Sequence, residues 1–183
     1  GMDNEIMEHM VYNKVDVVFG GGARHLIPSG DTYTTTFGDT WKGKRTDGEN
    51  LMTALTDNGY AFVDNKTDML SLTAMPAWGL FDDSHMDADI DRDNLHPTQP
   101  SIAQMTEKAI ELLSQDPDGF FLMVEGSQVD WAGHANDAAW MVTDFLAFDE
   151  AVGKALAFAR SNTDTLVLIF PDHNTGALSL GNS

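Results

Sequence analysis

Cysteine is absent from this sequence of 183 residues. A chain without thiols has no disulfide framework and no thiolate metal site, so any metal it binds is held by His, Asp or Glu. The absence of cysteine also leaves it undetermined whether the protein works in an oxidising or a reducing compartment.

Positive charge is scarce. Lys and Arg together number 10 and Asp and Glu number 29, which gives a formal net charge of −19. Such a surface repels phosphate backbones and anionic lipids, so we expect neither a nucleic-acid nor a membrane partner. An acidic surplus also suits a protein that binds cations, although a solvated acidic surface gives the same composition.

Long apolar runs are missing as well. No stretch approaches the length of about 20 apolar residues that a membrane-spanning helix needs. The N-terminal residues, from Gly1 to Glu5, have neither the basic nor the apolar region of a signal peptide. The hydrophobic content of 42% and the chain length fit one globular domain over residues 1–183.

Five short apolar runs predict β-strands. They are nearly continuous in apolar residues rather than alternating, which is typical of strands covered on both faces. The runs are Val15–Phe19, Tyr60–Val63, Ala77–Phe81, Gly119–Val124 and Thr165–Phe170.

Helical patterns lie between several of these runs. Ser101 can cap a helix that Pro117 would stop, and a longer helix is expected to begin near Asn136 or Asp137. A shorter helix is expected over Glu49–Asp57. Strands that alternate with helices indicate an α/β fold with a mostly parallel sheet flanked by helices.

Two stretches break this alternation and are expected to be irregular surface excursions, near residues 29–48 and 82–100. The second contains alternating aspartates from Asp87 to Asp93, which lack the central glycine and the closing glutamate of a calcium loop and indicate a solvated loop. Three glycines, Gly20 to Gly22, follow the first strand without a nucleotide-binding fingerprint and indicate a tight turn.

Metal-capable side chains follow two of the predicted strands. Glu125, Asp130 and His134 come after the fourth run, and Asp172 and His173 follow the fifth. Ligands of open α/β sheets lie beyond the carboxyl ends of the strands, and consecutive parallel strands are often neighbours. The two clusters could therefore meet in a site of oxygen and nitrogen ligands, which suits zinc with a harder ion at Glu125.

Each of these residues also has an ordinary structural interpretation. A single Glu after a strand is commonly a solvated loop residue, and an Asp-His pair is commonly a helix cap with a hydrogen-bonded imidazole. Spacing alone leaves both interpretations open.

The two ligand segments resemble those of the alkaline phosphatase family. The resemblance is carried by V-E-G-S-Q-V-D-W-A-G-H-A-N-D from Val124 and by P-D-H-N-T-G from Pro171. Further similar segments occur in family order, among them D-V-V-F-G-G-G-A-R from Asp16, R-T-D-G-E-N-L from Arg45 and S-I-A-Q-M-T-E-K-A from Ser101. The resemblance covers nearly the whole chain.

This resemblance implies roles for the five residues. Glu125 would be a magnesium ligand, Asp130 and His134 would bind one zinc ion, and Asp172 and His173 would bind the other. The family hydrolyses phosphate monoesters by attack of a serine on phosphorus, followed by hydrolysis of the phosphoserine. The resemblance also leaves a homodimer open and implies a periplasmic or extracellular location.

The sequence departs from the family pattern in several places. It contains no Asp-Ser-Ala nucleophile segment, no early-strand aspartate that bridges two metals, no phosphate-binding arginine and no distal zinc histidine. We therefore expect part of a phosphomonoesterase that is inactive by itself and binds zinc weakly. The alternative is a non-catalytic acidic module that binds metal or mediates assembly.

Overall fold

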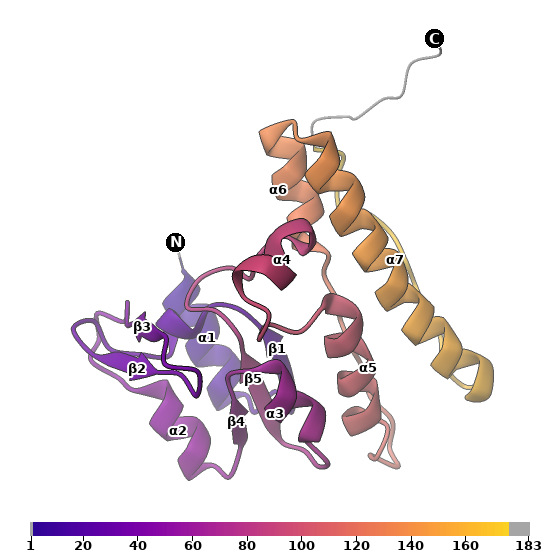
Figure 1. Cartoon of the computed structure of the whole chain (residues 1–183). Helices are drawn as coiled ribbons and strands as arrows, with labels where there is room; N and C mark the ends of the chain where they lie inside the picture. Colours follow the sequence, from indigo (N-terminus) through magenta and orange to yellow (C-terminus); the bar gives the residue numbers. More distant parts are fainter. Residues whose placement is uncertain (1, 176–183) are drawn as a thin grey trace.

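Three of the predicted strands pair into one parallel sheet. The computed structural model describes residues 2–175, and in it the strands β1 (Val17–Gly20), β4 (Ala61–Val63) and β5 (Ala77–Leu80) lie in the order β1-β5-β4. The central strand β5 is buried throughout, which explains its uninterrupted apolar sequence. Helices flank this sheet, so the expected α/β class is confirmed (Figure 1).

The main hydrophobic core lies between the sheet and the N-terminal helices. Helix α1 (Asp3–Tyr12), the 3-10 helix η1 (Ala23–His25) and helix α2 (Leu51–Asp57) contribute to it. Trp78 at its centre is fully buried, and its indole nitrogen donates to the carbonyl of Val15 at 3.0 Å. The other core members are Val11, Ala23, Leu26, Ile27, Trp41, Leu51, Leu55, Tyr60 and Leu80.

The glycine turn after β1 has a steric reason. Gly22 has a φ of +93°, which disfavours other residues, and a Cβ atom at Gly21 would lie 2.4 Å from the carbonyl oxygen of Ser84. The chain can therefore turn tightly and approach the segment after β5. The prediction of a tight turn is confirmed.

The three expected helices are present. Helix α5 (Ile102–Leu113) begins with a capping box, in which Ser101 and Gln104 satisfy each other's backbone N–H groups. Helix α7 (Ala138–Ser161) begins at the cap Asp137, whose side chain accepts from the backbone of Trp140. Helix α2 begins two residues later than expected.

The two predicted excursions contain regular structure. The first holds a short antiparallel hairpin of β2 (Thr32–Thr34) and β3 (Thr40–Lys42), and the second holds helix α4 (Asp89–Leu95). A further short helix, α3 (Lys66–Ser71), follows β4. The solvated loop expected over Asp87–Asp93 is therefore wrong for most of its length. Acidic residues in the first turn of α4 stabilise the helix because they interact favourably with its dipole. The comparison of Asp87–Asp93 with a calcium loop does not take this effect into account.

Helix α4 is anchored on α7 by a buried carboxylate. Both side-chain oxygens of Asp144 accept from the backbone N–H of Asp89, at 3.2 and 3.3 Å. Burial is the main cause that raises the pKa of Asp144, and the nearby charge of Asp89 adds to it. A carboxylate at a helix N-terminus thus fixes the position of α4 against α7.

Two of the five predicted strands, Gly119–Val124 and Thr165–Phe170, are wrong. Both segments lie outside any sheet in the described part of the chain, and most of their apolar side chains are exposed to solvent. Phe121 is 88% exposed, Leu168 69% and Phe170 77%. A strand needs a hydrogen-bonded neighbour, and residues 2–175 provide none for these two segments.

The longest helix, α7, runs along the outer side of α5 and also contacts α4 and α6 (Figure 1). It buries Asp144, Ala147 and Ala151, whereas Phe145 and Leu146 are 59% and 58% exposed. Within residues 2–175, no helix combines the length and the apolar character that crossing a membrane requires.

Candidate metal centre

Helix α6 (Ser127–Ala135) carries the first pair of predicted ligands. Asp130 and His134 are four residues apart, so they lie on the same face of the helix. His134 Nε2 lies 3.6 Å from Asp130 Oδ2. We did not expect a helix directly after Glu125, and it is this helix that brings the two side chains together.

The second pair of predicted ligands lies on the segment 171–175, which packs against α6. His173 Nε2 is 3.2 Å from Asp172 Oδ2, and His173 Nδ1 is 3.8 Å from Asp130 Oδ1. Asp130 and His173 therefore come together, through contact of this segment with a helix rather than through neighbouring strands, whereas Glu125 does not join them.

Thr175 links the two clusters and was given no role from the sequence. Its hydroxyl donates to Asp130 Oδ1 and lies 2.7 Å from His173 Nδ1. A hydroxyl has one hydrogen, so it can donate to the carboxylate only if it accepts from Nδ1–H of the imidazole. The final glycine of the P-D-H-N-T-G motif, Gly176, lies outside the described residues.

Gly133 permits this close packing. A Cβ atom at this position would lie 2.7 Å from the carbonyl oxygen of Thr175, nearer than real Cβ contacts allow. Only glycine on this face of α6 lets the segment 171–175 approach as it does. The glycine in W-A-G-H thus has a steric function that spacing alone does not reveal.

The donor atoms of both pairs suit zinc. Tetrahedral zinc with bonds of about 2.0–2.1 Å to nitrogen and oxygen places two ligand atoms about 3.3 Å apart. The observed separations are 3.6 Å for Asp130 and His134 and 3.2 Å for Asp172 and His173. Each pair supplies one imidazole and one carboxylate, whereas a catalytic zinc site commonly has three protein ligands.

Glu125 stands apart from these pairs. It is exposed and lies just before Gly126, the residue that precedes α6. Within residues 2–175 its carboxylate forms no ion pair with the other predicted ligands. The ligand roles of all five residues remain predictions.

A different trio of carboxylates is more closely grouped, around Arg45. Ligand oxygens of Glu8, Asp47 and Glu49 all lie within 4.8 Å of one another. In the described part of the chain this is the one group of three or more potential ligands that is so compact. Spacing in the sequence does not indicate this trio, because Glu8 is distant in the chain from the other two.

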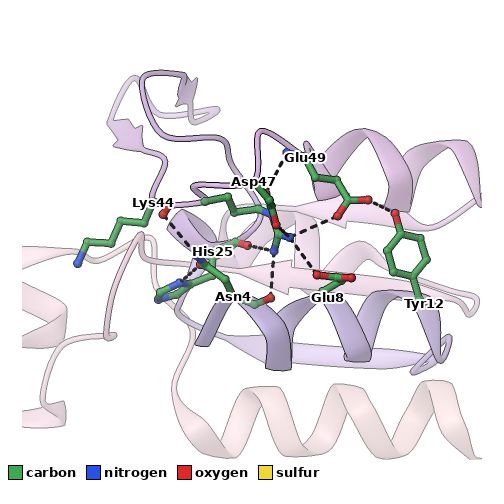
Figure 2. Close-up of polar contacts among 8 residues, drawn as sticks. Asn4, Glu8, Tyr12, His25, Lys44, Asp47 and Glu49 are labelled. Carbon is green, nitrogen blue, oxygen red and sulfur yellow. Dashed lines mark hydrogen bonds and ion pairs between the residues drawn. The ribbon is translucent and has the colours of Figure 1, made fainter. Parts of the chain in front are cut away.

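Arg45 already supplies the cation of this trio. Its side chain is fully buried, and its Nη2 atom pairs with Glu8 and Glu49 at 3.3 Å each and with Asp47. Its Nη1 atom donates to the carbonyl oxygens of Asn4 and His25, at 3.0 and 3.2 Å (Figure 2). The guanidinium thus ties α1 to the segment before α2, and we assign the trio a structural role.

Three of the four remaining histidines also acquire partners. His25 Nδ1 lies 2.8 Å from Asn4 Oδ1, and His96 Nδ1 lies 2.5 Å from Asp87 Oδ2. The ring of His85 packs against Trp131 with centroids 4.1 Å apart. None of these contacts joins the cluster around Asp130.

Comparisons with known proteins agree on one family. A family model described as alkaline phosphatase matches residues 1–183. Alkaline phosphatase 3 of Bacillus subtilis (strain 168) is 38% identical over 169 residues, which are 92% of this chain and 32% of that protein. The repressible alkaline phosphatase of Saccharomyces cerevisiae is 36% identical over an alignment of 189 positions, which covers 96% of this chain and 32% of that protein.

Solved structures give the same result. The alkaline phosphatase of Thermus thermophilus aligns with a TM-score of 0.75 and 30% identity, over 88% of this chain and 31% of that one. A mutant alkaline phosphatase from the bacterium TAB5, solved with magnesium bound, aligns with a TM-score of 0.66 and 28% identity, over 87% of this chain and 40% of that one.

The present chain spans about a third of the length of the two curated relatives. The match nevertheless runs through the whole of the present sequence, from Gly1 to Ser183. This chain belongs to the alkaline phosphatase family.

Proposed function

We propose that this chain provides part of the metal centre of a phosphomonoesterase that hydrolyses phosphate monoesters through a phosphoserine intermediate. The observation that carries the proposal is the meeting of two imidazole-carboxylate pairs from separate segments, in which His173 Nδ1 lies 3.8 Å from Asp130 Oδ1. Family membership supports the reaction class. The magnesium-bound relative supports a divalent metal.

The two pairs would each hold one zinc ion, and Glu125 would provide an oxygen ligand for magnesium. Bound zinc ions would lower the pKa of an attacking oxygen and offset the charge on the transferred phosphoryl group. The hydroxyl of Thr175 donates to Asp130 and also contacts Nδ1 of His173. These contacts orient the ligands before a metal arrives, which is the usual purpose of hydrogen bonds to ligand side chains.

We propose that the remaining ligands and the serine nucleophile come from polypeptide beyond these 183 residues. The exposed apolar side chains of Phe121, Leu168 and Phe170 support this, because extended segments with such side chains are stabilised when a neighbouring strand covers them. Both exposed segments lead directly to predicted ligands, Glu125 and Asp172. A strand that pairs with them would also bring its own side chains to the metal centre.

Activity of the complete protein that contains this segment tests the proposal. Replacement of Asp130 by Asn, or of His173 by Gln, should lower kcat/KM for an aryl phosphate by more than the 10- to 100-fold typical of residues that only orient ligands. Replacement of the exposed Asp149 on α7 by Asn removes the same charge away from the cluster and should leave activity unchanged. Full activity in the Asp130 and His173 variants would contradict the proposal.

A further inference from the structure

A recess lies beside the candidate metal centre, on a neighbouring face of α6. It has a volume of about 280 Å³ and is bounded by the segment before α4, by α4 itself, by α6 and by the start of α7. Its principal lining residues are His85, Met86, Asp87, Asp91, Trp131 and Trp140. None of the five proposed metal ligands lines this recess.

The aromatic part of the recess is held in a defined position. The ring of His85 packs edge-to-face on Trp131, with an interplanar angle of 65°. Trp131 is 40% exposed, so part of its indole remains free for a ligand. The amide of Gln128 donates to the carbonyl oxygen of Met86 at 2.6 Å, which ties α6 to the opposite wall. Indole faces are the best aromatic surfaces for cations.

The charge of the recess is negative. No lysine or arginine is among its lining residues in the described part of the chain. Arg92, the nearest basic residue in sequence, pairs with Asp89 at 3.0 Å and with Asp93 at 2.7 Å, and Asp91 forms no ion pair within residues 2–175. Asp87 is partly balanced by His96. Asp91 thus leaves an uncompensated carboxylate beside two indoles, a combination that favours an organic cation.

The recess is close enough to the metal centre to be occupied by the same ligand. Trp131 directly follows Asp130 on α6, and consecutive Cα atoms are about 3.8 Å apart. Successive side chains on a helix point about 100° apart, so the indole faces the recess while the carboxylate faces His173. A phosphate at Asp130 and a cation at Trp131 would need only a short linker between them.

We propose that this recess binds the quaternary ammonium group of a phosphorylated amino alcohol, so that the enzyme prefers substrates such as phosphocholine. This preference rests on the proposed phosphomonoesterase function of the Asp130 cluster. The phosphate would lie at the metal centre and the trimethylammonium group between Trp131, Trp140 and Asp91.

Substrate preference in the complete protein provides one test. Phosphocholine is compared with 3,3-dimethylbutyl phosphate, a neutral molecule of the same shape. We expect kcat/KM to favour phosphocholine by about 5- to 30-fold. Replacement of Asp91 by Asn should reduce this ratio several-fold while replacement of Asp149 by Asn preserves it. Equal kcat/KM for the two substrates, or a ratio that Asp91→Asn does not change, would overturn the preference.

Binding to the present chain provides a second test that needs no activity. Choline is titrated against 3,3-dimethylbutanol while the indole N–H signals of the four tryptophans are followed by NMR. The signals of Trp131 and Trp140 should shift with choline alone, and the buried Trp41 and Trp78 serve as internal controls. Absence of these shifts would refute the recess as a cation site. An inactive complete protein that still shows them would refute the phosphatase proposal instead.

Discussion

Replacement of Arg45 by Met should destabilise the chain severely. The guanidinium donates to two backbone carbonyls, those of Asn4 and His25, and pairs with three carboxylates. Two unsatisfied carbonyls cost about 1–3 kcal/mol each. The three carboxylate side chains are 37–45% exposed, so water can replace much of the interaction that they lose with the guanidinium. We expect a loss of about 3–5 kcal/mol in the free energy of unfolding.

Urea unfolding, followed by tryptophan fluorescence, measures this loss. Arg45→Lys is the matched variant, because lysine keeps the charge but cannot form the planar fork of hydrogen bonds. It should lose less stability than Arg45→Met. A loss below about 1 kcal/mol in Arg45→Met would refute the structural role.

Calcium binding tests more directly whether the Arg45 guanidinium occupies the place of a metal ion among the three carboxylates. In Arg45→Met the three carboxylates face one another without a cation, so 10 mM Ca²⁺ should restore about 1.4 kcal/mol if its Kd is about 1 mM. The parent chain should not respond, because the guanidinium fills the space. Equal stabilisation of both proteins by calcium would contradict the assignment.

Three further predictions concern the candidate centre and a nearby ion pair. In a calorimetric titration, Thr175→Val should weaken zinc binding at His173 by about 10-fold, whereas Thr175→Ser should preserve it. Equal zinc affinity of the two variants would exclude the orienting role of the hydroxyl. Gly133→Ala should weaken zinc binding without loss of helix by circular dichroism, because the new methyl displaces the segment at Thr175; unchanged binding would contradict this. The hydrogen bond that the His96 imidazole donates to the Asp87 carboxylate raises the pKa of His96, so the stabilisation it provides is present below about pH 6.5 and is lost as the pH rises through the folded pKa. Thermal melts should show a loss of less than about 1 kcal/mol of stability in the parent chain and no such loss in Asp87→Asn. Identical pH profiles of the two proteins would refute this role of the ion pair.

The sequence predicted the elements whose signals are local. The capped helices at Ser101 and Asp137 begin where their side chains can accept backbone N–H groups. The buried strand β5 is recognisable by its continuous apolar run. Such features depend on neighbouring residues and need no knowledge of distant contacts.

Features that depend on distant contacts were missed. The apolar run at Gly119–Val124 has the composition of a buried strand, yet no strand in residues 2–175 pairs with it. The role of Thr175 depends on contact with Asp130, 45 residues earlier, and that of Arg45 depends on Glu8, 37 residues earlier. Local sequence patterns do not indicate contacts between residues so far apart in the chain, so these contacts can be identified only from the structure.

The central claim is that His134 and His173 are the zinc-binding histidines of this chain. Zinc titration with ¹⁵N NMR of the imidazole nitrogens tests it most directly, because all six histidines report separately. We expect the Nε2 signals of His134 and His173 to shift, with saturation only in large zinc excess because each pair is an incomplete site. His9 and His25 should stay unchanged. Zinc-dependent shifts at other histidines with none at His134 and His173, or tight binding of two zinc ions by this chain alone, would contradict the account.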